Sequence, residues 1–415
     1  MFNQSAANQP HSKFRIICSS CLLVLIFSLP FSTSASTILA LLLMLLWVGE
    51  GRFREKFAEI RGNEVALAVL AYVGLHLLGL LWSTDLREGF AVMRSQWKLL
   101  LLPVVMTIVV RKDRHSYIHS FIAAMTISMI VSYLIWFGLL SERHATHVDP
   151  TPFIDHISYN PFLAWAIYLT LQEAFFRPLS RTRKYGFLAL ALAMTINLLI
   201  TQGRSGQVAF LALLILFIIQ YWRYKIMSAT LVSMLVLTTV LGGAYLTIPN
   251  FKQRIATTID EVFLYRQKGP GGADTSVGLR ITFILNSIRM IKSNPLLGVG
   301  TGDFAEEYEV INRRYSPECP TTKNPHNQYL MATTHFGICG LLLLLFIFYR
   351  QFQSARLEPE ESPQLRLALS IFYLILCFGE SYLQIHTTTL LYSIFGGIIF
   401  KKGDECCLNL SRDHR

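Results

Sequence analysis

The chain has 415 residues, of which 53% are hydrophobic and only 15% are charged. This composition excludes a soluble globular protein, because the apolar residues form blocks of about twenty, the length of helix that crosses a bilayer. A formal net charge of +11 would suggest nucleic-acid binding in a soluble protein, but here its distribution between the blocks gives orientation instead. Transmembrane strands are excluded because the blocks do not alternate. The sequence therefore predicts an all-α polytopic membrane protein.

The first apolar block, IICSSCLLVLIFSLPF, follows Lys13 and Arg15 and resembles a signal peptide. A second block, STILALLLMLLWVG, comes directly after it, so we interpret the first as an uncleaved span. Hydropathy predicts about twelve spans in all. They lie near residues 16–33, 35–49, 64–82, 91–110, 117–140, 157–176, 185–200, 206–222, 227–247, 327–349, 365–382 and 386–400.

Arginine and lysine concentrate in alternate connections: GRFREKFAEIRGN, RKDRHS, RPLSRTRK, YWRYK and RQFQSARLEPEESPQLR. The connections between them, such as STDLREG and TQGRSG, carry few. The positive-inside rule therefore predicts that both termini are cytoplasmic. The expected organisation is nine spans in residues 1–247, a large periplasmic loop in 248–326, three spans in 327–400 and a cytoplasmic tail in 401–415.

The predicted periplasmic loop has a helical periodicity of its own. Its apolar residues recur at spacings of three and four: Val277, Ile281, Ile284, Ile288 and Ile291. They predict a helix with one apolar face, with Arg280 at the edge of that face and Asn294-Pro295 ending it. The following LLGVGTGDF lacks the Lys-Ser or Lys-Thr of a phosphate loop, so we expect a turn in which the backbone approaches a ligand or a helix.

Two arginines stand in places where the predicted topology tolerates few positive charges. Arg204 lies in TQGRSGQ at the outer end of the eighth span, and Arg280 borders the loop helix. Each has two interpretations: an interfacial side chain, or a bidentate ligand of a phosphate group. Two such arginines at one membrane face would suit a diphosphate.

His326 stands in NPHNQYL, directly before the tenth span. A histidine there is either an amphipathic anchor in the headgroup region or a general base, since imidazole titrates near neutral pH. His335 follows nine residues later, on the opposite side of a helix, so these two histidines do not form a metal site from one helix.

Two other groups of polar residues have no motif to support them. Asp303, Glu306 and Glu307 have helical spacing and are interpreted as a solvated or ion-paired face, with contact to the acceptor or metal binding as the alternative. His144, His147, Asp155 and His156 gather before the sixth span.

Together, the TxxRSG-like turn, GLR near the start of a loop helix, NPLLGVGTGDF and NPHNQYL resemble the O-antigen ligase and polymerase superfamily over roughly residues 190–350. The resemblance implies a membrane glycosyltransferase of the GT-C type in the bacterial inner membrane. Its donor would be a glycan linked to undecaprenyl diphosphate. It implies a catalytic role for His326 and substrate contacts for Arg204, Arg280 and Asn327, the last of which follows the histidine as the family pattern expects.

The predicted function is an O-antigen ligase that transfers O-antigen to lipid A–core oligosaccharide at the periplasmic face, without a metal or cofactor. An O-antigen polymerase and a protein O-oligosaccharyltransferase would use the same donor and stay open. A lipid-linked-glycan transporter is a more distant alternative, for which Arg94 and Lys98 are the main charged residues inside the spans.

Overall fold

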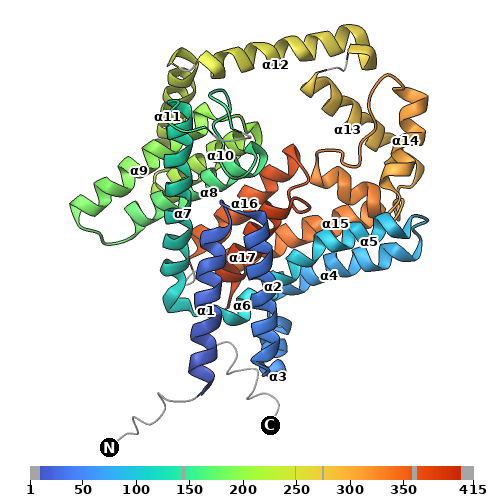
Figure 1. The fold of residues 1–415 in the computed structure, drawn as a ribbon. Helices are drawn as coiled ribbons and strands as arrows, with labels where there is room; N and C mark the ends of the chain where they lie inside the picture. Colours follow the sequence, from blue (N-terminus) through green and yellow to red (C-terminus); the bar gives the residue numbers. More distant parts are fainter. Residues whose placement is uncertain (1–9, 142–144, 248, 273–274, 358–361, 403–415) are drawn as a thin grey trace, which may run out of the picture.

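The computed structural model describes residues 10–141, 145–247, 249–272, 275–357 and 362–402, and this part of the chain is helical, without a strand. Figure 1 shows its arrangement. The α-helices are α1 (Pro10–Ser28), α2 (Thr33–Gly49), α3 (Phe53–Arg61), α4 (Glu64–Leu78), α5 (Leu86–Gln96), α6 (Leu101–Ile108), α7 (Arg114–Trp136), α8 (His156–Phe176), α9 (Arg181–Ile200), α10 (Arg204–Tyr221), α11 (Ile226–Thr247), α12 (Pro249–Lys268), α13 (Ser276–Ser293), α14 (Phe304–Tyr315), α15 (Gln328–Leu357), α16 (Pro363–Gly379) and α17 (His386–Phe400).

Each of the twelve predicted spans coincides with a helix or with a broken helix such as α5–α6. Among the described residues, seven helices are long and apolar enough to cross a membrane, or up to eight if α2 and α3, bent by 114°, form one broken span. Helices α16 and α17 and the apolar part of α1 are shorter than that length. The all-helical, multi-pass architecture is confirmed, whereas the count of twelve spans stays a prediction.

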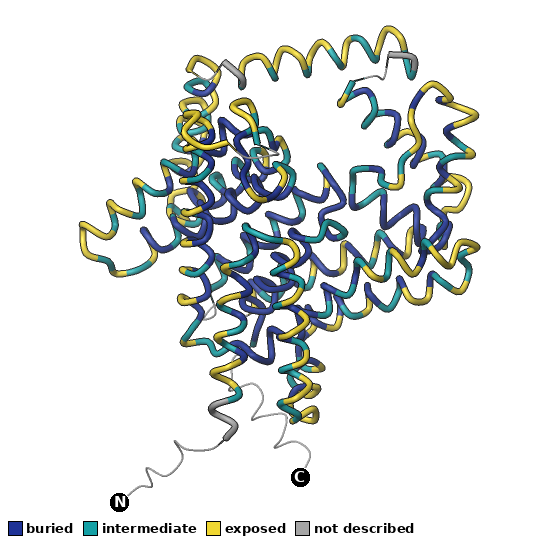
Figure 2. Tube along the Cα trace, viewed as in Figure 1, coloured by how far each residue is buried: buried dark blue, intermediate teal, exposed yellow. Residues whose placement is uncertain are grey.

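The core of the bundle is built around α8 and α17. Both helices are buried over most of their length, and Figure 2 shows this buried centre in dark blue. Trp165 of α8 stacks on Tyr168 and on Phe372 of α16, with ring centroids 5.5 Å apart in each pair. In contrast, α11 has only three buried residues and turns most of its apolar side chains outward. Such an outer surface suits contact with lipid.

The basic connections of the sequence meet at one end of the bundle. The Arg114 guanidinium donates to the Ser362 hydroxyl at 3.0 Å, and the Lys401 ammonium donates to Glu59 at 2.8 Å. The start of α1 and helix α3 lie at this end, at the bottom of Figure 1, and α12 lies at the top. The structure thus groups the predicted cytoplasmic connections together. Which end faces the cytoplasm remains a prediction.

The predicted loop helix is confirmed as α13, which is capped by Thr275 and ends before Asn294. The residues that it buries within the protein centre on Asn286 and not on its apolar isoleucine face. Its Asn286 amide donates to Asn312 at 3.2 Å and to Ser316 at 2.7 Å, so a polar network joins α13 to α14. The isoleucines stay partly exposed, because satisfying buried amides takes precedence over burying every apolar side chain.

The turn at LLGVGTGDF packs against a kink in α15. Gly298 and Gly300 have positive φ angles of 66° and 97°, and a Cβ on Gly298 would lie 2.4 Å from the carbonyl carbon of His335. The Val299 amide donates to the Thr334 carbonyl at 2.9 Å. The glycines therefore allow the backbone of the turn to approach a helix closely. The sequence predicted close approach either to a helix or to a ligand.

Candidate active site

His326 is paired with a buried carboxylate from the far end of α16. Its Nδ1 lies 2.5 Å from Glu380 Oε2, and the Glu380 side chain is only 3% exposed. The His326 ring stacks on Phe283 of α13 at a centroid distance of 5.7 Å. With the carboxylate ionised, Nδ1 carries the shared proton, so Nε2 is left as a hydrogen-bond acceptor. This is the arrangement of a general base held by an acidic partner.

The loop around His326 is fixed by hydrogen bonds. The Asn324 amide donates to Glu380 Oε1 at 2.8 Å, while Asn324 Oδ1 accepts from the His326 backbone amide at 2.9 Å. His326 has a φ of 53°, in the left-handed region that costs a non-glycine residue free energy. Burial raises the pKa of Glu380, but hydrogen bonds from His326, Ser381 and Asn324 hold that pKa below its usual value.

Arg204 is placed by the close contact of α10 with α8. A Cβ on Gly203 would lie 2.4 Å from the His156 carbonyl oxygen, and one on Gly206 would lie 2.4 Å from the Asn160 carbonyl carbon. The Asn160 amide also donates to the Gly203 carbonyl at 3.1 Å. The two glycines that flank Arg204 thus allow α10 to begin directly against α8, with Arg204 as its first residue.

Arg204 and Arg280 line the same polar pocket, which has a volume of about 210 Å³. Glu380, the partner of His326, also lines it, together with His156, Ser205 and Tyr382. The guanidinium group of neither arginine forms a hydrogen bond or an ion pair with any residue that the structure describes. Two guanidinium groups without a carboxylate partner in one pocket can bind a polyanion such as a diphosphate.

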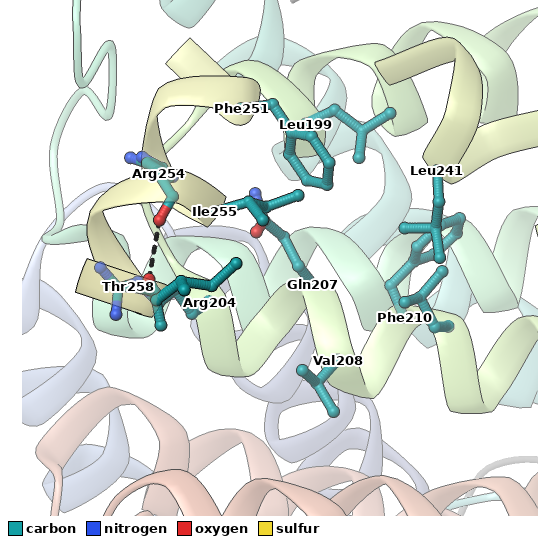
Figure 3. A pocket seen from close by; sticks show the side chains of 12 residues that line it. Leu199, Arg204, Gln207, Val208, Phe210, Leu241, Phe251, Arg254, Ile255 and Thr258 are labelled. Carbon is teal, nitrogen blue, oxygen red and sulfur yellow. Dashed lines mark hydrogen bonds between the residues drawn. The ribbon is translucent and has the colours of Figure 1, made fainter. Parts of the chain in front are cut away.

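A second, mostly apolar pocket of about 290 Å³ shares Arg204 and lies between α9, α10, α11 and α12. Figure 3 shows Phe251, Ile255 and Leu199 around it, with Arg254 beside Arg204. The Arg254 side chain donates to the Thr201 carbonyl at 3.1 Å, which holds α12 against the end of α9. An apolar pocket next to a cationic one suits an amphipathic lipid with an anionic headgroup.

Asn327 has a structural position at the start of α15. Its Oδ1 accepts from the Leu330 amide at 3.0 Å, as an N-cap does, and its Nδ2 donates to the Phe378 carbonyl at 3.1 Å. Both polar atoms of the side chain are therefore engaged within the protein. A substrate-binding role for Asn327 stays a prediction that this geometry does not favour.

The Asp303 carboxylate is 6% exposed and accepts from the backbone amides of Thr84 and Asp85 at 2.8 Å each, so it joins α14 to the start of α5. Glu306 and Glu307 are exposed on the first turn of α14. Among the described residues, no group of three or more His, Cys, Asp or Glu side chains is placed to hold a metal ion.

The histidine cluster before α8 is dispersed. His156 binds Asp149 at 2.8 Å, Asp155 caps α8, and His147 lies 3.2 Å from the Trp136 carbonyl. His144 lies outside the described residues. Of the charged residues considered for a transporter, Lys98 is buried and donates to the Ser95 carbonyl at 3.0 Å, whereas Arg94 is exposed.

Sequence reasoning missed Glu380 and Arg254. Glu380 had a detectable signal, because it is an acidic residue placed directly after an apolar helix, in LCFGESYL. Arg254 lies among other charged residues of α12, in NFKQRIATTIDEVF, and nothing in its immediate sequence distinguishes it.

Part of the chain is similar to a described protein family. No curated protein matches the chain at a significant level. Residues 189–345 match the family model described as O-antigen ligase. The matched segment includes Arg204, Arg280 and His326 but ends before Glu380. With its multiple apolar helices, the match indicates a multi-pass bacterial membrane protein and supports membership of the chain in the O-antigen ligase/polymerase superfamily.

Proposed function

We propose that the protein is an O-antigen ligase of the bacterial inner membrane, with its site facing the periplasm. It transfers a polysaccharide from undecaprenyl diphosphate to a sugar hydroxyl of lipid A–core oligosaccharide. The observation that carries the proposal is the pocket that combines Arg204, Arg280 and Glu380, with His326 bonded to that glutamate. It joins anion-binding groups to a proton acceptor, which are the two functions that the reaction needs.

In the proposed reaction, Arg204 and Arg280 bind the diphosphate and stabilise the negative charge that grows as the sugar–phosphate bond breaks. Nε2 of His326 accepts the proton of the acceptor hydroxyl, whose oxygen forms the new bond at the anomeric carbon. Undecaprenyl diphosphate leaves with the electron pair of the broken bond. A single displacement of this kind inverts the anomeric configuration.

The apolar pocket supports a donor with a lipid chain. It adjoins the polar pocket at Arg204, so a molecule with its diphosphate at the arginines could extend its first isoprenoid units between Phe251, Ile255 and Phe210. Apolar lining is the environment that such units prefer. Arg254 at the edge of this pocket adds a third positive charge near Arg204.

Deletion of the gene tests the proposal in cells. We expect lipopolysaccharide without long O-antigen chains, together with accumulation of the polymer on its lipid carrier. Core that carries single repeat units would identify a polymerase instead and would overturn the choice of acceptor. Unchanged lipopolysaccharide would overturn both activities and direct attention to a protein acceptor.

The diphosphate assignment predicts that Arg204→Lys and Arg280→Lys are both damaging although each keeps its charge. A lysine ammonium cannot reproduce the two parallel hydrogen bonds of a guanidinium, so donor affinity and turnover should each fall about tenfold or more. Donor binding and transfer by the purified variants give the measurement. Arg266→Lys, a change at an exposed position of α12, is the control. Normal activity of either pocket variant would reduce that arginine to an interfacial side chain.

In the proposed mechanism, arginines supply the positive charge that a metal ion would otherwise supply. Transfer should therefore continue in the presence of a chelator that removes Mg²⁺, Mn²⁺ and Ca²⁺. Glu306→Gln and Glu307→Gln should keep their activity, because both side chains are exposed on α14. Asp303→Asn should lower the melting temperature, since its NH₂ group would replace the oxygen that accepts from the Thr84 amide at 2.8 Å and the negative charge that both amides face would be lost. Transfer that stops with chelator and returns with added metal would contradict the arginine mechanism.

A further inference from the structure

A further pocket, of about 470 Å³ and here called the basic pocket, lies at the end of the bundle where the basic connections meet. Its lining includes Arg114, Glu173, Arg177, Arg223 and the first turn of α16. Along α8, Glu173 follows His156 of the candidate active site by about 17 residues, or roughly 25 Å of helix. This pocket is therefore separate from the one that contains Arg204 and Arg280.

Arg114 is the most important residue of this basic pocket for ligand binding. It is only 9% exposed, and its Nη1 donates to the Ser362 hydroxyl at 3.0 Å. Its Nε and Nη2 have no hydrogen-bond partner within the part of the chain that the structure describes. A guanidinium stays charged, and burying its donors without acceptors is costly. The side chain thus lacks an acceptor on the edge formed by these two nitrogens.

The nearby carboxylate does not supply that acceptor. Glu173 binds His115 at 3.0 Å, His119 at 2.7 Å and Arg177 at 2.8 Å, and its own side chain is 4% exposed. The lining thus contains three arginines and one carboxylate that is already fully engaged. Arg111 and Arg366 add further positive charge near Arg114. The electrostatic field in this pocket favours an anion.

The start of α16 strengthens the same preference. Its N-cap residue, Ser362, has a φ of 59° and makes no side-chain hydrogen bond to the first amides of the helix. Residues Pro363, Gln364 and Leu365 of the first turn line the pocket. Pro363 has no amide hydrogen, and the Leu365 amide donates to the Ser362 carbonyl at 3.0 Å, so among these three residues the Gln364 amide is left to face a ligand. The positive end of the helix dipole adds to the charge of the buried Arg114 guanidinium with its unmatched donors.

We propose that this pocket binds a phosphate group. A tetrahedral phosphate presents paired oxygen acceptors that match the Nε and Nη2 edge of Arg114, and the exposed Arg223 at the rim contacts a third oxygen. The phosphate comes either from the headgroup of an anionic phospholipid in the adjacent leaflet or from the surrounding solution. The site does not depend on the proposed transferase function.

The experiment uses the full-length protein, purified in detergent. One arm measures the retention of phosphatidylglycerol by native mass spectrometry after incorporation into phosphatidylcholine nanodiscs that contain one third phosphatidylglycerol. The other arm titrates inorganic phosphate and records the melting temperature. We expect saturable binding in at least one arm. Arg114→Gln should weaken it about tenfold and Arg223→Gln by a smaller factor. Arg61→Gln, at an exposed position of α3, is the matched control and should change nothing.

The two arms identify the source of the phosphate. Retained phosphatidylglycerol that the pocket variants lose supports a lipid headgroup, and stabilisation by inorganic phosphate alone supports a soluble ligand. Equal binding by the wild type, Arg114→Gln and Arg223→Gln would overturn the proposal, as would an equal loss in Arg61→Gln. Because Arg223 is exposed, its variant keeps the test decisive even if Arg114→Gln fails to fold.

Discussion

Replacing His326 with alanine should reduce transfer by about 10²- to 10⁴-fold, the usual contribution of a positioned general base. The imidazole has an acidic partner on Nδ1 and leaves Nε2 free to accept a proton, so its removal takes away the proton acceptor together with the hydrogen bond to Glu380 and the ring contact with Phe283. Donor binding should persist, because it rests on Arg204 and Arg280. The measurement is the rate of transfer by the purified variant under saturating donor, together with donor affinity.

A second variant separates catalysis from folding at this position. His326→Gln keeps a polar side chain that can still donate a hydrogen bond to Glu380 but cannot act as a base. It should therefore fold normally and remain inactive. His147→Ala, at an exposed histidine outside the pocket, should keep full activity. Full transfer by either His326 variant would rule out the base. Loss of membrane insertion in both would instead support the interfacial-anchor interpretation of this histidine.

Glu380→Gln should lower the rate constant for transfer by about 10²- to 10⁴-fold, as expected when the acidic partner of a catalytic histidine loses its charge. The glutamine amide can still accept from Asn324 and Ser381 through its oxygen. Its NH₂ group, however, would donate to His326 Nδ1 and move the imidazole proton to Nε2, where it blocks base catalysis. The charge that would stabilise the protonated imidazole is lost as well.

The split between kinetic constants distinguishes this role from a merely structural one. Glu380 lines the pocket of Arg204 and Arg280, so removing its negative charge should leave donor affinity unchanged or increase it while the rate constant falls. Glu380→Asp keeps the charge and should retain more activity than Glu380→Gln. A variant in which donor affinity and melting temperature fall while the rate constant stays normal would show that Glu380 only supports the fold.

The sequence was sufficient for the helical class and for most of the candidate site. Arg204, Arg280 and His326 were predicted from short motifs, and these motifs include the residues that shape the backbone locally, such as the glycines that flank Arg204. The pairing of His326 with Glu380 was not predictable, because 54 residues separate them and the contact depends on how α16 packs against the loop before α15. Hydropathy treats residues 365–382 as one apolar block and therefore hides the acid at its end.

Hydrogen bonding explains two features that periodicity does not reveal. The periodic isoleucines of α13 mark its apolar face, but the residues that the helix buries centre on Asn286, whose amide donates to Asn312 and Ser316. Asp303 appeared to belong to an exposed acidic face, yet it accepts two backbone amides from residues more than 200 positions away. Periodicity shows only which residues of a helix are apolar. It cannot show which polar side chains are buried, because that depends on hydrogen-bond partners that lie far away in the sequence.

The most direct test of the central claim is reconstituted transfer with purified protein, undecaprenyl-diphosphate-linked O-antigen and lipid A–core oligosaccharide, in the presence of chelator. The account predicts lipid A–core that carries polysaccharide through an inverted anomeric linkage, one undecaprenyl diphosphate released for each transfer, and no product with His326→Ala. Unmodified lipid A–core, with a carrier-linked glycan that instead grows longer, would contradict it.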